Sequence, residues 1–143
     1  MPRRTFGKDA QAIGGSASHK KEKKYALGNN MKTLEAFYTA LENHDWKGAR
    51  ALLHDNFRFR GPSQQADSVD DFIATNRQIN PDWKFRDVEM TEDANIIMSF
   101  FTTIMTRPAQ GSNRCAERVE IRHGKLASIE LIYDSAGFRP LPV

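Results

Sequence analysis

Cysteine is nearly absent from this sequence, and long apolar runs are missing altogether. Cys115 is the one cysteine in 143 residues, which excludes an internal disulfide and any zinc site built on several thiolates. Without a run of about 18 apolar residues, the sequence predicts no membrane span. The basic residues near the start are not followed by an apolar stretch, so we expect no secretory signal and a cytoplasmic location.

Clustered metal ligands and phosphate-binding motifs are also missing. The four histidines fall in separate segments and none is spaced with a second ligand; they are His19, His44, His54 and His123. Neither a glycine-rich phosphate loop nor a Gly-x-Ser-x-Gly turn occurs. We therefore expect no metal and no cofactor.

Positive charge is concentrated in the first 30 residues. The whole chain has a net charge of +3, but residues 1–30 carry +5 and residues 31–143 carry −2. This split predicts a flexible basic extension over 1–30 and a folded domain over 31–143. The extension is either a plain segment ahead of the domain or an electrostatic tether to an anionic partner. Because the domain itself is slightly acidic, we do not expect a nucleic-acid partner.

Three helices are predicted in the first half of the domain. Apolar residues recur at helical spacing over 31–44, with Asn30 as the expected N-cap. Asp45 caps a second, short helix, and Ser68 opens a third helix with a capping box. Pro81 ends this third helix at the latest.

Strands dominate the second half. Residues 57–60 alternate with period two before Gly61-Pro62, and four more strands follow at 83–91, 95–106, 114–122 and 125–134. The glycine and polar residues of 108–113 predict a loop, and His123-Gly124 predicts a tight turn. Helices that precede an antiparallel meander indicate the α+β class.

Three stretches of this sequence resemble the SnoaL-like branch of the nuclear transport factor two-like superfamily. Residues 37–46 are similar to its first helix and the Asp that starts the second helix. Residues 52–62 are similar to its entry into the first strand, and residues 124–134 to its last strand, which ends in an aromatic residue and an Asp. The resemblance covers residues 31–138. It implies a curved sheet wrapped around the helices as a cone with a deep pocket, and a homodimer.

Strand parity identifies the side chains that face this pocket. Cys115 and Glu117 share one face of strand 114–122 with Val119 and Ile121, so the apolar set brings a carboxylate inward. A carboxylate on an apolar face is paired, protonated or placed at a wet pocket. The other expected pocket residues are mainly aromatic: Phe37, Tyr38, Phe59 and Trp83, with Tyr133 at the pocket mouth.

The superfamily includes ketosteroid isomerase, scytalone dehydratase, limonene-epoxide hydrolase, polyketide cyclases and non-catalytic domains. By resemblance, the isomerase's catalytic base corresponds to Gly61 and its tyrosine to Phe37, which argues against that isomerisation; Tyr38 is a partial substitute. Its protonated acid corresponds to Glu117. Asp134 corresponds to the acid/base Asp of the polyketide cyclases, although strand parity turns it away from the pocket.

Glu117, Tyr133 and Asp134 are therefore the candidate catalytic residues, each with a structural alternative. Glu117 could be a buried, satisfied acid, Tyr133 a core aromatic residue and Asp134 a strand-end turn residue. We expect an apolar pocket for a hydrophobic small molecule, with cofactor-independent acid/base chemistry of the isomerase, lyase or cyclase type. The alternative is a non-catalytic ligand-binding or dimeric interaction domain. A pocket filled by Phe37, Phe59, Phe100 or Phe101 would exclude the first hypothesis.

Overall fold

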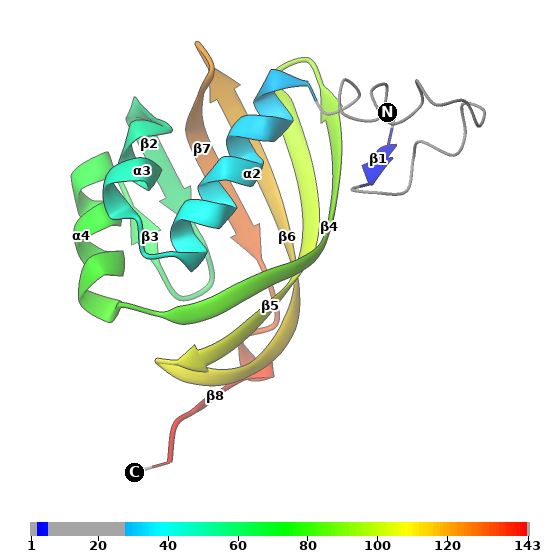
Figure 1. The fold of residues 1–143 in the computed structure, drawn as a ribbon. Helices are drawn as coiled ribbons and strands as arrows, with labels where there is room; N and C mark the ends of the chain where they lie inside the picture. The colour runs from blue at the N-terminus through cyan, green and yellow to red at the C-terminus, as the bar shows by residue number, and fades with distance from the viewer. Residues whose placement is uncertain (1–2, 6–27, 143) are drawn as a thin grey trace.

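A curved mixed sheet holds α2 across its concave side in this computed structural model, which describes residues 3–5 and 28–142 (Figure 1). Helices α3 and α4 lie beside α2 toward the β2–β3 side of the sheet. The helices are α2 (Asn29–Glu42), α3 (Trp46–Ala51), α4 (Val69–Ile79) and the short 3-10 turn η2 (Ser135–Gly137). The strands are β1 (Arg3–Thr5), β2 (Leu53–Arg60), β3 (Gln65–Ala66), β4 (Asp82–Asp93), β5 (Ile96–Arg107), β6 (Ala109–Arg122), β7 (Lys125–Ile132) and β8 (Phe138–Pro140).

The predicted antiparallel meander is confirmed as β4-β5-β6-β7, and the α+β class with it. Strand β7 continues the sheet by pairing in parallel with β2, which pairs in turn with β3. At the end of the molecule where the chain finishes, β8 pairs with the first residues of β6. The sheet order among the described strands is β1-β4-β5-β6-β7-β2-β3, with β8 attached to β6.

The loop predicted over 108–113 is wrong, because β6 already begins at Ala109. Gly111 pairs with Met105 of β5 on one side and with Phe138 of β8 on the other. A Cβ atom at this position would lie 2.2 Å from the carbonyl oxygen of Gly137, so the close approach of the η2 backbone just before β8 requires a glycine. The glycine that suggested a turn therefore serves a backbone contact inside the sheet.

Two of the three predicted helix caps are confirmed. The Asp45 carboxylate accepts a hydrogen bond from the backbone N–H of Gly48, and the Ser68 hydroxyl accepts one from Asp71. The cap at Asn30 is wrong, because α2 begins at Asn29. The side-chain amide of Asn30 instead donates to Glu92 at 2.9 Å, which ties the start of α2 to β4.

The predicted N-terminal extension is described in part. Arg3–Thr5 form β1, which pairs antiparallel with Glu89–Thr91 at the edge of β4. Residues 6–27 lie outside the described residues, so the flexibility predicted for this segment and the domain boundary at residue 30 stay predictions.

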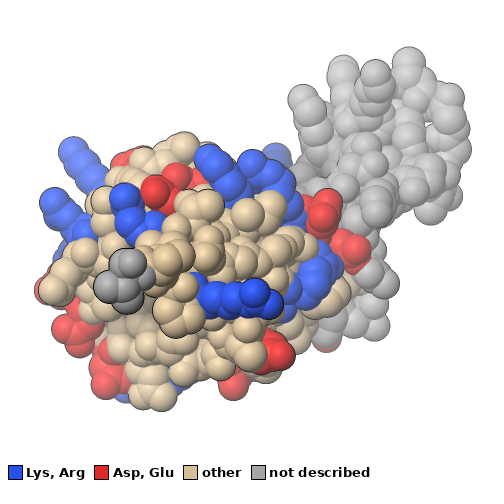
Figure 2. Space-filling model, turned by 90° about the horizontal axis from the view of Figure 1, so that it is seen from below, with Lys and Arg blue, Asp and Glu red and all other residues tan. Residues whose placement is uncertain are grey.

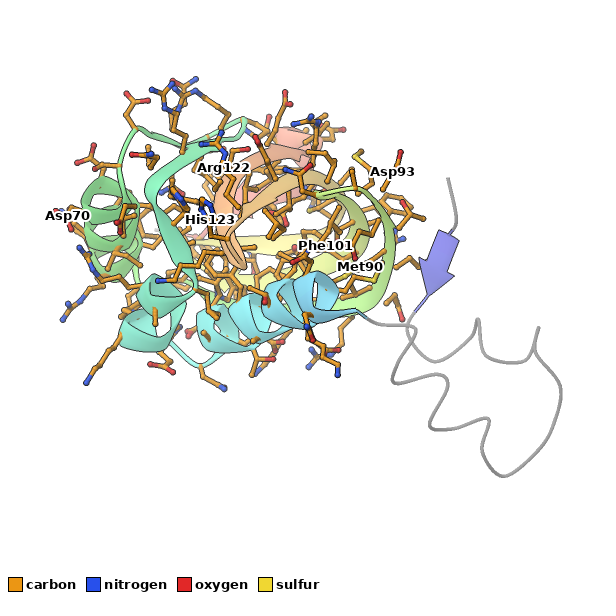
Figure 3. All side chains as sticks on the ribbon, turned by 90° about the horizontal axis from the view of Figure 1, so that it is seen from above. Asp70, Met90, Asp93, Phe101, Arg122 and His123 are labelled. Atoms are coloured by element: carbon orange, nitrogen blue, oxygen red, sulfur yellow. The ribbon has the colours of Figure 1, made fainter. Side chains whose placement is uncertain are left out.

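The core lies between the concave face of the sheet and the buried side of α2. In β6, Cys115, Glu117, Val119 and Ile121 are buried, as parity predicted, and the residues between them face outward. Phe101 of β5 and Met90 of β4 lie inside the molecule next to α2, whereas Asp70 and Asp93 are at its periphery (Figure 3).

Candidate functional site

A cavity of about 310 Å³ opens between the concave face of the sheet, α2, α4 and the β2–β3 loop. Its volume is at the lower end of the range for small-molecule sites, which is roughly 300–1,000 Å³. The four phenylalanines that could have filled the pocket leave it open. Phe37, Phe59 and Phe101 line the cavity, and Phe100 lies on the outer face of the sheet.

The walls are largely aromatic and aliphatic. Every predicted pocket residue lies among the lining residues, namely Phe37, Tyr38, Phe59, Trp83 and Cys115. Trp83 is held by its indole N–H, which donates to the backbone oxygen of Leu41 at 2.8 Å. Glu117 is the carboxylate among the lining residues, and none of the described Lys, Arg and His residues lines the cavity with it.

Glu117 is 6% exposed and lies in the middle of β6, opposite Ser99 of β5 and Leu131 of β7. Its Oε1 accepts a hydrogen bond from the Tyr38 hydroxyl at 2.5 Å. Within the described residues Tyr38 is its hydrogen-bond partner, so Oε2 can meet a molecule in the cavity. Burial away from water raises the pKa of Glu117 to about 7, against the smaller lowering effect of the Tyr38 hydrogen bond.

Tyr38 projects from α2 toward the sheet, where its hydroxyl contacts Glu117 of β6. Its ring is held between Phe85 and Phe101, with centroids at 5.3 and 5.1 Å, and its hydroxyl also contacts the Ser99 hydroxyl at 3.0 Å. Burial and the neighbouring Glu117 raise the pKa of Tyr38 well above its ordinary value of 10. The hydroxyl therefore keeps its proton at neutral pH and acts as a donor to Glu117.

This arrangement can take up and return protons near neutral pH. A general base works best when its pKa lies near the operating pH, and Glu117 meets this condition through burial. Perturbed carboxylates in a cavity are typical of functional sites.

Tyr133 lines the cavity but does not bond Glu117. Its hydroxyl lies 2.8 Å from the hydroxyl of Ser63 in the β2–β3 loop, and its ring packs edge-on against Phe138. The acid/base pair considered from sequence, Glu117 with Tyr133, is therefore replaced in the structure by Glu117 with Tyr38.

Asp134 is exposed and is not among the lining residues of the cavity. Because β7 ends at Ile132, Asp134 precedes η2, and its carboxylate accepts a hydrogen bond from the backbone N–H of Ala136 at 3.0 Å. This is the turn role that the sequence offered as the alternative for this residue.

Cys115 is 2% exposed and lies two residues before Glu117, with its Sγ 3.5 Å from the hydroxyl of Thr103. Burial raises the pKa of its thiol, which keeps it protonated and unreactive at neutral pH.

Sequence reasoning missed several polar residues of the site. Ser99 faces the cavity side because it pairs with Glu117 across β5 and β6, a register that could not be read from the chain. Ser63 and Gln64 belong to the loop after the Gly61-Pro62 signal and also line the cavity. The Nε2 atom of Gln64 is buried and has no hydrogen-bond partner in the part of the chain that the structure describes.

Comparison with known families agrees with this geometry. The sequence model of the SnoaL-like domain matches residues 34–129, which contain most of α2, the whole of α3 and α4, Tyr38 and Glu117. The chain belongs to the SnoaL-like domain family. The fold of this SnoaL-like domain is that of solved structures named as NTF2-like, in agreement with the sequence resemblance.

Solved structures with this fold carry several different names. An epoxide hydrolase of the LEH-like type from M. tuberculosis superposes with a TM-score of 0.69 at 15% identity, over 76% of this SnoaL-like chain and 85% of its own. A proposed polyketide cyclase from Pseudomonas putida KT2440 gives 0.67 at 15% identity, over 76% and 93%. A proposed ketosteroid isomerase from Kribbella flavida DSM 17836 gives 0.61 at 16% identity, over 80% and 84%.

At these identities the likeness establishes the fold of the SnoaL-like chain and leaves its chemistry open. No protein in the comparison with curated sequences matches it. Among residues 3–5 and 28–142, no helix has the length and apolar character needed to cross a membrane. In the same residues, no three His, Cys, Asp or Glu side chains gather as metal ligands would.

Proposed function

We propose that the cavity binds an uncharged hydrophobic small molecule and that Glu117 moves a proton on it without a cofactor. The observation that carries this proposal is the Glu117 carboxylate, buried in an apolar cavity and bonded through one oxygen to Tyr38. A structural acid would be expected to have both oxygens satisfied, whereas Oε2 has no protein partner among the described residues.

The proton transfer follows from this geometry. Ionised Glu117 takes a proton from an acidic C–H bond of the ligand through Oε2, and the electron pair of that bond delocalises into the ligand. Neutral Glu117 then returns the proton at another atom of the same molecule. Tyr38 is a positioning residue, since its hydroxyl holds the carboxylate and stabilises the ionised form.

The same proton transfer serves isomerisation, elimination and ring closure, so the reaction class is isomerase, lyase or cyclase. The names of the structural relatives, which include a proposed polyketide cyclase and a proposed ketosteroid isomerase, support this range. Asp134 is not part of the mechanism, because its carboxylate bonds the η2 backbone.

Deuterium exchange tests the proposal without knowledge of the natural substrate. 2-Tetralone, an uncharged bicyclic ketone with acidic C–H bonds, is incubated in D2O with the protein, and incorporation is followed by mass spectrometry. We expect exchange above the buffer rate that rises with pH to a plateau with a midpoint near 7, because the ionised form of Glu117 is the base.

The matched variants are Glu117→Gln and Glu120→Gln. Both remove one carboxylate from β6, but Glu120 faces outward and pairs with Arg122 at 3.3 Å. Glu117→Gln should slow exchange by about 100-fold or more, as loss of a general base does, and Glu120→Gln should leave it unchanged. Exchange that survives in Glu117→Gln, or that never exceeds buffer in the wild type, refutes the proposal.

A second candidate function, self-association through the outer face of the sheet, is favoured by exposed apolar residues. Met98, Phe100 and Ile104 of β5 are 41–45% exposed, and Ile132 of β7 is 62% exposed. Phe100 and Ile132 both lie opposite Ala116, so they sit in one row across three strands. A row of exposed apolar side chains is typical of protein interfaces.

Light scattering distinguishes a homodimer from a monomer of 16.3 kDa. We expect about twice the monomer mass, and a return to the monomer mass in Ile132→Asp. Leu141→Asp is the control, because Leu141 is 39% exposed but lies beyond β8, away from this row. A wild-type mass near 16 kDa contradicts the homodimer.

A further inference from the structure

A short segment near the end of the chain covers one end of the cavity. Residues 134–140 contain η2 and β8, and we call them the C-terminal strap. Two residues of the strap, Ser135 and Phe138, line the cavity together with Ala109 at the start of β6. Glu117 lies in the middle of β6, whereas β8 lies at the lower end of the sheet in Figure 1. The strap therefore covers the end of the cavity that is remote from the carboxylate.

The β2–β3 loop meets the chain just before the strap at this end of the cavity. The hydroxyls of Ser63 in the loop and of Tyr133, the residue before the strap, are 2.8 Å apart. The ring of Tyr133 also packs edge-on against the ring of Phe138, with centroids at 5.4 Å. All three residues line the cavity. Because the two hydroxyls are in contact, a ligand with fused rings passes between loop and strap only when one of them moves.

Few contacts hold the strap on the sheet. Strand β8 pairs with three residues of β6, Ala109–Gly111, and Pro140 within β8 has no N–H to donate. At the start of the strap, the side-chain amide of Asn113 donates to the carbonyl oxygen of Asp134 at 2.8 Å. None of the residues 134–140 is buried. A segment with so little buried surface opens at a much lower free energy than the core does.

The other segments at this end of the cavity are held more firmly. In the β2–β3 loop, the Gly61 N–H donates to the Gln64 carbonyl oxygen at 2.9 Å, and Ala66 just after the loop is 3% exposed. The guanidinium of Arg107 donates twice to the carbonyl oxygen of Asn80, at 3.2 and 3.1 Å, which joins the end of α4 to the end of β5. The strap is therefore the segment that moves at the lowest cost.

Two glycines give the strap a defined position on β6. Gly111 of β6 meets the η2 backbone without a Cβ atom, as described above. Gly137 of the strap does the same in return, because a Cβ atom there would lie 2.3 Å from Oδ1 of Asn113. The strap thus fits closely onto β6 although few hydrogen bonds hold it, which is what a segment with a closed and an open state needs.

The surface around the strap suits an uncharged ligand. A broad uncharged area occupies much of the molecular face on the side of β8 (Figure 2). Among the described residues, no Lys, Arg or His lines the cavity behind the strap. An entrance at the strap therefore joins an uncharged surface to an apolar cavity wall, which favours the passage of a molecule without charge.

We propose that the C-terminal strap is the gate of the cavity: η2 and β8 detach from β6 to admit a ligand and pair with it again to enclose the ligand. The gate rests on the proposed function in that it assumes an uncharged ligand in this cavity. It adds a conformational step to that function, and its residues are separate from Glu117 and Tyr38.

A disulfide between β6 and β8 tests the gate. Gln110 and Arg139 are paired across these strands, and both are exposed and do not line the cavity. The Cα atoms of such antiparallel partners lie about 4.5–5.5 Å apart, within the range that a disulfide spans. The full chain with Gln110→Cys and Arg139→Cys is compared in its oxidised and reduced forms. Cys115 stays outside this bond, because it is buried and the pKa of its thiol is raised.

Binding of N-phenyl-1-naphthylamine, an uncharged fluorescent probe, is followed by stopped-flow fluorescence. Oxidation should slow association and dissociation alike by about 10-fold or more, because the strap must open before each of them. The dissociation constant should stay nearly the same, and reduction should restore both rates. The matched control is Arg122→Cys with Lys125→Cys, an exposed pair at the other end of β6, whose oxidation should leave both rates unchanged.

Asn113→Ala tests the gate in the opposite direction. It removes the hydrogen bond to Asp134 and leaves the cavity wall intact, since Asn113 does not line the cavity. Association and dissociation should each become faster by about 3- to 10-fold, the effect of one neutral hydrogen bond.

Four results would overturn the gate. They are equal rates in the oxidised and reduced forms of the Gln110→Cys, Arg139→Cys variant, unchanged rates in Asn113→Ala, and no binding of the probe to the wild type. The fourth is a disulfide that does not form, which would contradict the pairing of β8 with β6.

The gate and the proton transfer fail in different measurements. If the disulfide slows probe binding but deuterium exchange does not depend on Glu117, the proton-transfer function is refuted and the gate stands. If exchange depends on Glu117 while the disulfide leaves the binding rates unchanged, the gate is refuted and the proton transfer stands.

Discussion

The two faces of strand β6 place a glutamate in opposite environments, one buried and one open to water. On the inner face, Glu117 is 6% exposed and its hydrogen-bond partner is Tyr38. Three residues later on the outer face, Glu120 is partly exposed and pairs with the guanidinium of Arg122. Burial brings the pKa of Glu117 to about 7, into the range where a carboxylate exchanges protons at neutral pH.

Strand β5 shows the same contrast with phenylalanine. Phe101 is 2% exposed and packs against Tyr38 and Phe85, while its neighbour Phe100 is 45% exposed below the guanidinium of Arg114. A one-residue step along a strand therefore separates the cavity wall from an open surface. It is the access of water on each face, rather than residue type, that decides what a side chain contributes.

The largest effect expected from the difference between the two faces is on the free energy of unfolding. Phe101→Ala should lower the free energy of unfolding by about 3–5 kcal/mol, because it removes a buried ring and leaves a larger void. Phe100→Ala should cost no more than about 1 kcal/mol, the value of an exposed cation–π contact. Urea unfolding of both variants measures the difference, and equal losses would mean that Phe100 is also buried in solution.

Glu117→Gln should change how stability depends on pH. The pKa of Glu117 is about 7 in the folded protein and 4.5 when unperturbed, so the folded state binds more protons between these values and wild-type stability falls as pH rises through this window. The fall attributable to Glu117 is about 3 kcal/mol and is complete above pH 7.

The variant lacks this contribution, since glutamine does not ionise and can still accept the Tyr38 hydrogen bond. Its stability relative to wild type should therefore increase from pH 4.5 to 8. Glu120→Gln serves as the comparison on the outer face. A constant difference between Glu117→Gln and wild type over this pH range would show that Glu117 is not desolvated.

The smallest of these effects concerns the Tyr38 hydrogen bond, which lowers the pKa of Glu117 against the effect of burial. Tyr38→Phe removes that bond, so the pH midpoint of deuterium exchange should rise above 7 by about one unit, the equivalent of a charge-assisted hydrogen bond of about 1.5 kcal/mol. Tyr133→Phe removes a hydroxyl from the cavity mouth and should leave the midpoint in place. A shared shift in both variants would contradict the pairing of Tyr38 with Glu117.

Much of the fold followed from local patterns. Period-two alternation identified the inward position of Glu117, and capping residues marked the starts of α3 and α4. Local patterns were wrong where long-range backbone contacts took over. Gly111 indicated a loop by composition, but pairing with β5 and β8 made it part of a strand. Asn30 looked like a helix cap, but its side chain bonds Glu92, 62 residues away.

The candidate site likewise has one part that local patterns predicted and another that depends on long-range contacts. The sequence by itself determined that one carboxylate would face an aromatic interior, because side chains alternate along a strand whatever its neighbours are. Only the tertiary structure decided that Tyr38 bonds this carboxylate, that Asp134 turns to the η2 backbone, and that Gln64 of the β2–β3 loop lines the cavity. The physical reason is that such contacts depend on how α2 and the β2–β3 loop are placed over the sheet, and that placement depends on packing between segments far apart in the chain.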